Sequence, residues 1–172
     1  MGLFKPHRYY RDIYSIDYTK LKNEGINCLI FDLDNTLGLI TNRKCPEKTR
    51  ELIRSLQKDF CIFICSNNTK GRLKPYTRDL GVGGVSWSLK PSIRGLRKIK
   101  RNYGFNKKEM VMIGDQIVTD VLAGKRYRIK TILVDPLGKK DLKITGLNRT
   151  IENFILKKYE KRGVFERGKY YE

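Results

Sequence analysis

The chain has 172 residues and carries 37 Lys and Arg against 18 Asp and Glu, a formal charge of +19. The length favours one domain over two, and the charge favours anionic partners such as phosphate esters, nucleic acid or acidic lipid over cationic ones. No apolar run approaches the roughly 20 residues that a membrane-spanning helix needs, and residues 1–6 lack the apolar core of a secretory signal. We therefore expect a cytoplasmic protein, either free or peripheral at the inner face of the membrane.

The four cysteines, Cys28, Cys45, Cys61 and Cys65, indicate a reducing compartment. Cys61 and Cys65 fall on one face of a predicted strand, about 13 Å apart at the usual rise, which is too far for a disulfide. We expect both to be free and buried in the core. His7 is the single histidine, and one histidine does not make a metal site.

Residues 1–26 form a basic and aromatic segment ahead of the main domain. Four of its residues follow a helical i, i+1, i+4, i+5 spacing, which predicts a short amphipathic helix. These are Tyr9, Tyr10, Ile13 and Tyr14. A second helix is predicted over 18–24, with Asp17 as its N-cap. The tyrosines either pack on the domain or contact a membrane surface, because Tyr and Lys suit the headgroup region.

Strand and helix patterns then alternate. Short apolar runs predict strands at 28–31, 60–65, 85–87, 110–113 and 131–134. Helical spacing predicts helices at 46–58, from near 74 to 80, at 93–103, at 120–123 with a stop at Gly124, and at 151–159. This alternation favours an α/β fold with a doubly wound parallel sheet flanked by helices. We place the domain at 27–160 and expect 161–172 to be a basic tail that need not be ordered.

Polar residues follow the carboxyl ends of the predicted strands. They are Asp32, Asp34, Ser66, Lys90, Asp115 and Asp120. In open α/β sheets the ligand lies outside these strand ends. A single Asp or Ser there can be the cap of the next helix, but a Lys, a Ser and four carboxylates on one edge indicate a site.

These residue types suit phosphate chemistry. Crowded carboxylates favour a hard divalent cation, and Mg²⁺ prefers oxygen ligands. One carboxylate can attack phosphorus while the metal and Lys90 offset its charge. Asp34 can protonate the leaving oxygen and then deprotonate water, and the Ser66 hydroxyl, Lys90 and backbone N–H groups can hold the phosphate oxygens.

The same residues resemble the four motifs of the haloacid dehalogenase (HAD) superfamily of phosphotransferases, in order, over about residues 28–135. The matching segments are Asp32-x-Asp34-x-Thr36, Ser66, Lys90-Pro91 and Gly114-Asp115-x4-Asp120. The resemblance implies a phosphatase with Asp32 as the nucleophile that forms an aspartyl-phosphate and Asp34 as the general acid and base.

The resemblance also implies the binding groups of the site. Ser66, Asn67 and Lys90 would bind phosphate. Asp32, the backbone carbonyl of Asp34 and Asp115 would bind Mg²⁺, with Asp120 acting through a water molecule or orienting Asp115.

The intervals 37–60 and 66–90 are too short for the cap domain that many members of the superfamily carry, so we expect an open site that suits a substrate attached to something large. The segments 31–37, 66–68 and 113–121 resemble the capless branch of YqeG-type bacterial proteins and mitochondrial phosphatidylglycerophosphatases. That resemblance implies dephosphorylation of phosphatidylglycerophosphate to phosphatidylglycerol at a membrane surface.

Two other functions stay open on the sequence alone. The first is a HAD phosphatase for a soluble sugar phosphate, nucleotide or phosphoprotein. The second is a non-catalytic RNA- or ribosome-associated basic protein, which the charge permits although no RNA-binding motif is visible. The sequence does not indicate the oligomeric state.

A basic stripe follows Lys90 on the predicted helix at 93–103. It consists of Arg94, Arg97, Lys98 and Arg101, with no acid between Lys90 and Arg101. The stripe is either an ordinary solvated face or a contact with an anionic membrane.

Overall fold

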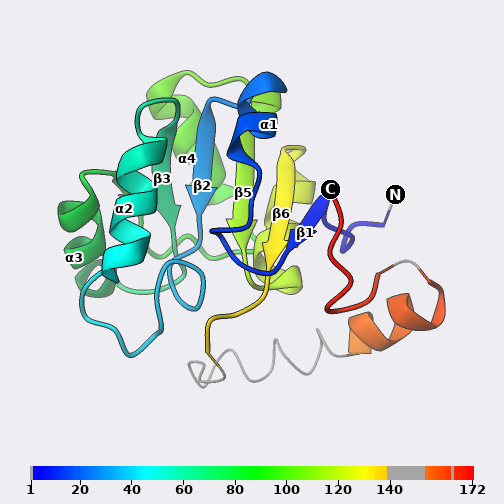
Figure 1. Cartoon of the computed structure of the whole chain (residues 1–172). Coiled ribbons are helices and arrows are strands. Elements are labelled where there is room, and N and C mark those ends of the chain that lie inside the picture. The colour runs from blue at the N-terminus through cyan, green and yellow to red at the C-terminus, as the bar shows by residue number, and fades with distance from the viewer. Residues whose placement is uncertain (1, 139–153, 164) are drawn as a thin grey trace.

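The computed structural model describes residues 2–138, 154–163 and 165–172. Its centre is a six-stranded parallel sheet with the strand order β1-β6-β5-β2-β3-β4 (Figure 1). The strands are β1 (Arg8–Tyr10), β2 (Cys28–Phe31), β3 (Cys61–Cys65), β4 (Gly83–Val85), β5 (Met110–Gly114) and β6 (Lys130–Val134). The predicted α/β fold with a parallel sheet is therefore confirmed.

Helices cover both faces of the sheet. They are α1 (Tyr18–Asn23), α2 (Glu47–Leu56), α3 (Lys70–Leu80), α4 (Arg94–Tyr103) and α5 (Leu122–Tyr127), with a 3-10 turn at Lys107–Glu109, a π-helical turn at Ile117–Val121, and a last helix described over 154–161. In Figure 1, α1 and α2 lie in front of the sheet and α4 lies behind it. No described helix is long and apolar enough to cross a membrane.

The core consists of two apolar layers, because side chains alternate along the central strands. Leu29 and Phe31 of β2 pack with α1, α2 and α3 on one face. Cys28 and Ile30 pack with α4 and α5 on the other. Strands buried on both faces explain why the central runs of the sequence are continuously apolar.

The helix predicted for the N-terminal aromatic residues is wrong. Arg8–Tyr10 forms a strand beside β6, not a helix, with Arg8 opposite Ile132. Tyr9 and Tyr10 are buried, so they pack on the domain and do not offer a membrane contact. The predicted helix with Asp17 as its N-cap is confirmed, since the Asp17 side chain accepts a hydrogen bond from the Lys20 N–H.

Two boundaries near β4 also differ from the prediction. Helix α3 begins at Lys70, where the Thr69 side chain caps it, and it includes Pro75 in its interior. The strand lies at Gly83–Val85 rather than at 85–87. A Cβ on Gly83 would come within 2.7 Å of the Phe63 ring, so only glycine permits this close pairing with β3.

Smaller corrections concern Gly124 and Cys61. Gly124 lies inside α5, where a Cβ would come within 2.3 Å of the Thr131 side chain. Helix α5 ends instead at Tyr127, with Arg128 in the left-handed conformation. All four cysteines are free as expected, but Cys61 is exposed.

The residues that we expected as a basic tail contact the domain. Phe165 is buried among apolar residues that include Tyr9. Tyr171 pairs with Tyr9 in the antiparallel sense, through N–H to carbonyl hydrogen bonds of 2.8 and 3.0 Å. The residues after 164 therefore cover the outer edge of β1.

Candidate active site

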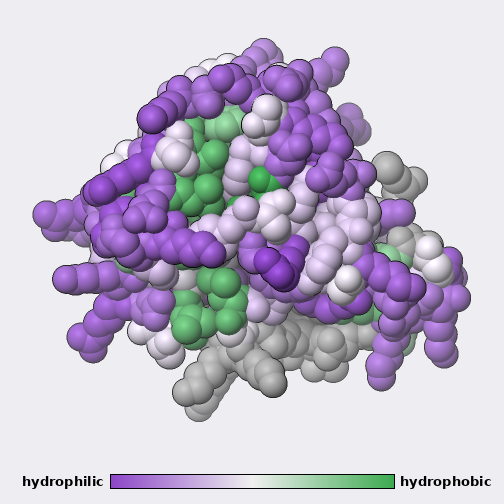
Figure 2. All heavy atoms as spheres, viewed as in Figure 1, coloured by the Kyte–Doolittle hydropathy of each residue, from purple (hydrophilic) through white to green (hydrophobic). Residues whose placement is uncertain are grey.

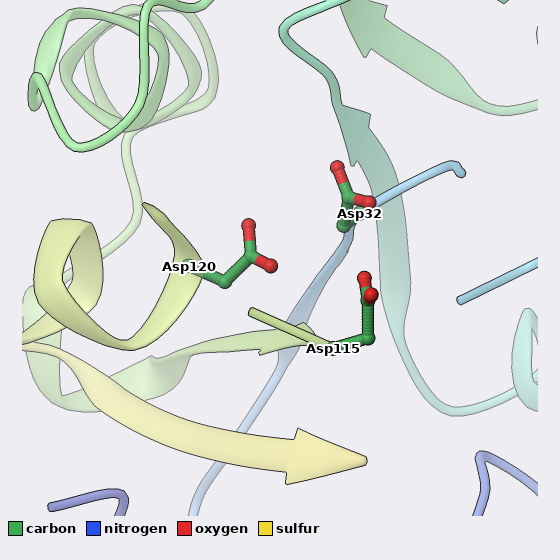
Figure 3. A group of neighbouring side chains, drawn as sticks. All are labelled: Asp32, Asp115 and Asp120. Atoms are coloured by element: carbon green, nitrogen blue, oxygen red, sulfur yellow. The ribbon is translucent and has the colours of Figure 1, made fainter. Parts of the chain in front are cut away.

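Three carboxylates from two central strand ends converge at the carboxyl edge of the sheet (Figure 3). Asp32 follows β2, Asp115 follows β5, and Asp120 lies in the π-helical turn after β5. The Asp32 N–H donates to the Ile113 carbonyl at 2.8 Å, which continues the pairing of the two strands to the site. One oxygen from each carboxylate lies within 4.8 Å of the other two.

Lys90 lies among these carboxylates, with only 2% of its side chain exposed. Its Nζ donates to Asp120 Oδ1 at 2.6 Å and to Asp32 Oδ1. Asn67 fixes the loop that carries this lysine, since its Oδ1 accepts the Lys90 N–H at 2.7 Å and its Nδ2 donates to the Lys90 carbonyl at 3.0 Å. The Asn67 side chain thus braces the Lys90 loop, and its expected contact with phosphate stays a prediction.

Among the described residues, the cluster carries too few positive charges to balance its acids. Burial raises the pKa of Asp32 to about 7, with Lys90 opposing the shift and Asp120 adding to it. Burial also disfavours the charge on Lys90, but Asp120 and Asp32 outweigh it and raise the pKa of this ammonium. One ammonium faces three carboxylates, so a divalent cation with oxygen ligands fits the remaining charge and donor set.

Neighbouring groups fix the other two acids. Asp115 is buried and accepts a hydrogen bond from the Thr36 hydroxyl at 3.1 Å. Asp120 Oδ2 accepts the Gln116 N–H at 3.1 Å. A Cβ on Gly114 would lie 2.3 Å from the Asp120 carboxylate, which explains the Gly before Asp115. The Asp120 side chain also pairs with Lys90, and its expected role at the metal, through water or by orienting Asp115, stays a prediction.

Asp34 is held by groups that the sequence analysis did not identify. Arg72 of α3 donates to Asp34 Oδ1 from Nε at 3.0 Å and from Nη2 at 2.8 Å. Asn68 Nδ2 donates to Asp34 Oδ2 at 3.1 Å. Arg72 also bonds the carbonyls of Leu39 and Asn42, so one side chain fixes both Asp34 and the loop after it.

Ser66 lies at the end of β3, as expected. It is buried, and its Oγ accepts the Asn68 N–H at 3.0 Å. The structure thus brings Asp32, Lys90, Asp115 and Asp120 together at one point. Ser66 and Asp34 lie on two neighbouring loops, and Asn68 of the Ser66 loop donates a hydrogen bond to Asp34.

Exposed apolar side chains lie on the loops around this cluster. They are Leu39, Trp87, Leu89 and Leu137, each more than a third exposed. Trp87 and Leu89 adopt φ values of 49° and 56°, which non-glycine residues rarely do. Figure 2 shows an apolar patch at the end of the molecule to which the strand arrows of Figure 1 point. The loop between β4 and α4 therefore presents Trp87 and Leu89 to solvent at a cost in backbone strain.

Comparison with known proteins gives consistent relatives. Residues 89–143 match the HAD-hydrolase-like family. Over 93% of its length the chain is 34% identical to a Bacillus subtilis (strain 168) protein named Probable phosphatase YqeG, of which it covers 94%. It is 24% identical to phosphatidylglycerophosphate phosphatase 1, chloroplastic/mitochondrial, of Arabidopsis thaliana, over 92% of this chain and 49% of that protein.

Solved structures share the fold at low identity. The cobalt-bound form of deoxy-D-mannose-octulosonate 8-phosphate phosphatase from Haemophilus influenzae aligns with a TM-score of 0.51 at 20% identity, over 84% of this chain and 95% of that one. A protein from Listeria monocytogenes serotype 4b aligns with a TM-score of 0.55 at 16% identity, over 77% of this chain and 99% of that one.

Proposed function

We propose, because the chain belongs to the YqeG-type phosphatases of the HAD-like hydrolases, that it hydrolyses phosphate monoesters through an aspartyl-phosphate at Asp32. The observation that carries this proposal is the buried contact of Lys90 with Asp32 and Asp120 beside Asp115, at the edge where parallel sheets bind ligands.

The proposed reaction has two displacements. An Asp32 oxygen attacks phosphorus, the bond from phosphorus to the ester oxygen breaks, and Asp34 gives that oxygen a proton. Asp34 then takes a proton from a water molecule, which attacks the same phosphorus and releases Asp32 as a carboxylate. Lys90 holds the attacking oxygen in place and offsets negative charge that develops on the phosphate.

Mg²⁺ fits the site as the metal. Asp32, the backbone carbonyl of Asp34 and Asp115 would hold it, and Asp120 would act through water. When bound, the cation would neutralise the carboxylates and polarise a phosphate oxygen. Arg72 and Asn68 hold both oxygens of Asp34, and thereby set the direction from which this carboxyl meets the leaving oxygen.

For the substrate we propose a lipid-linked phosphate, with phosphatidylglycerophosphate as the first candidate. Relatives at 24% identity are named for that activity. Trp87 and Leu89 present apolar side chains beside the site, and Trp suits the interface between lipid and water. The four residues of the basic stripe on α4 are exposed, as predicted, and each can add on the order of 1 kcal/mol near an acidic bilayer.

The test compares phosphatidylglycerophosphate in micelles with a panel of soluble phosphates and an aryl phosphate, each with and without Mg²⁺. Trp87→Ser with Leu89→Ser should weaken liposome binding and raise KM for the lipid roughly tenfold or more, and leave the aryl phosphate unchanged. Leu3→Ser is the control, since Leu3 is equally exposed at the other end of the sheet. Turnover of a soluble phosphate without turnover of the lipid would overturn the lipid substrate and keep the phosphatase.

The stripe gives a second arm of this experiment. Exchanging Arg94, Arg97, Lys98 and Arg101 for Gln should weaken binding to acidic liposomes, most of all at low salt. Aryl phosphate hydrolysis should be retained because none of the four contacts the carboxylate cluster. Unchanged liposome binding would assign the stripe to ordinary surface.

A further inference from the structure

A pocket of about 650 Å³ opens at the amino end of the sheet. Five cations line it: Lys107 and Lys108 in the 3-10 turn before β5, Lys125 and Arg128 at the end of α5, and Lys130 at the start of β6. Because all six strands are parallel, this amino-end pocket and the carboxylate cluster lie at opposite ends of the sheet. Its volume is typical of sites for small ligands.

The positive charge of this amino-end pocket is not balanced by the described acids. Among the described residues Glu24 is the one carboxylate in the lining. It pairs with Arg8 and, at 2.6 Å, with Lys130, which lines the same pocket. Within the described ranges no ion pair joins a carboxylate to Lys107, Lys108, Lys125 or Arg128. Four cations therefore face a common space from two sides.

The contact between His7 and Lys125 points to a missing acceptor. The Thr131 backbone N–H donates to His7 Nδ1 at 3.0 Å, and the Thr131 hydroxyl, which can also donate, lies 2.9 Å from the same nitrogen. We therefore assign the proton of the neutral ring to Nε2. That nitrogen lies 3.3 Å from Lys125 Nζ, and an ammonium offers only donors. Two donors thus face each other, which becomes favourable when an anionic oxygen accepts from both.

The electrostatics of His7 agree with this geometry. The pKa of His7 is lowered to about 4, mainly by burial and then by the positive charges of Lys125, Lys130 and Arg8, in that order. Burial, followed by the charge of Lys5, lowers the pKa of Lys125. A bound anion would reverse the repulsion among these groups.

We propose that the amino-end pocket is a second ligand site, separate from catalysis, that binds an anion with at least two phosphate groups. One phosphate would lie between His7 and Lys125, near Arg128, and the other would meet Lys107 and Lys108. The shared chemistry is a diphosphate, free or as part of a nucleotide, for which Leu3 and Ile129 supply apolar contacts at the same pocket.

His7 gives a direct readout because it is the single histidine of the chain. Its imidazole resonances should move and saturate when sodium pyrophosphate is added to the full chain without Mg²⁺ at about pH 6, where anion binding raises the ring pKa toward that pH. The Lys108→Gln, Lys125→Gln double variant should bind pyrophosphate at least about tenfold more weakly. The Arg54→Gln, Lys58→Gln control removes the same charge from exposed positions at α2 and should bind as the wild type does.

Aryl phosphate hydrolysis checks the fold of each variant, since none of these residues lies in the catalytic cluster. Tighter binding of ADP than of pyrophosphate would identify a nucleotide, and equal binding would identify the diphosphate alone. Inorganic phosphate that binds as tightly as pyrophosphate, a stationary His7 resonance, or an equal loss in both double variants would overturn the proposal.

Discussion

The two ends of the parallel sheet carry opposite local charge. At the carboxyl end, Asp32, Asp115 and Asp120 surround the single ammonium of Lys90. At the amino end, four cations without a carboxylate partner line a pocket in which Glu24, the one lining carboxylate among the described residues, pairs with a fifth cation, Lys130. The formal charge of +19 predicts neither arrangement. The positions of unbalanced charges therefore tell more about ligands than the net charge of the chain does. Here these positions predict a bound cation at the carboxyl end and a bound anion at the amino end.

Catalysis at the carboxyl end of the sheet depends on the Asp32 carboxylate. Asp32→Asn should lower aryl phosphate hydrolysis by roughly 10⁴- to 10⁶-fold, because it removes the nucleophile and keeps its shape. Steady-state rates and trapping of the phosphoenzyme measure this. Asp135→Asn is the matched control, since Asp135 also follows a strand but accepts hydrogen bonds from Tyr9 and Tyr170. Equal losses in both variants would contradict the assignment.

Removing the one cation of the acidic end should cost stability as well as activity. Lys90→Met removes the partner of Asp32 and leaves the charge of Asp120 uncompensated, and it should lower the free energy of unfolding by about 3–5 kcal/mol. Denaturant titration without metal measures the loss. Adding Asp120→Asn to Lys90→Met should restore part of it, whereas a further additive loss would show that Lys90 and Asp120 are not coupled.

Arg72 tests whether the acidic end needs precise positioning. Arg72→Met frees the Asp34 carboxylate and should lower kcat for an alkyl phosphate by roughly 10- to 100-fold. The loss should be smaller for a nitrophenyl phosphate, whose leaving group needs no proton. Arg50→Met is the control, because Arg50 pairs with Asp79 and Glu47 away from the site. The same loss on both substrates would assign Arg72 to the fold of the loop and not to Asp34.

The smallest effect should appear at the amino end. Since the folded-state pKa of His7 is about 4, below its usual 6.5, the unfolded chain binds the proton more tightly, and His7 removes stability as the pH falls from 6.5 towards 4. Relative to His7→Asn, the wild type should lose about 1 to 3 °C of Tm between neutral pH and about pH 5, a modest shift because the ring is half-exposed. Parallel Tm curves for the two proteins would contradict it.

The sequence predicted the carboxylate cluster because apolar runs locate strand ends independently of any partner. Asp32 and Asp115 directly follow β2 and β5, which pair with each other. Lys90 lies further along, in the loop after β4. Arg72 was missed because Pro75 moved the predicted start of its helix to near 74, which left Arg72 in a loop. The Thr69 N-cap was the available signal.

Strand β1 and the amino-end pocket could not be predicted, for a different reason. Three residues, Arg8–Tyr10, are too few to show a period of two, and their aromatic spacing also fits a helix. Lys107 and Lys125 look like ordinary surface until the strand order brings the ends of distant loops together. Both features depend on contacts between residues far apart in the chain.

The pairing of β1 with β6 has a consequence for synthesis of the chain. His7 bonds Thr131, 124 positions later, and of the six strands β6 is the only one that pairs with β1. At the usual rates of translation, β1 leaves the ribosome on the order of 10 seconds before its partner does. During that interval the Tyr9 ring lacks Leu133 and Phe165, two of the residues among which it is buried. The first strand to be made is therefore the last to join the sheet. Until β6 is made, the other strands must fold without β1.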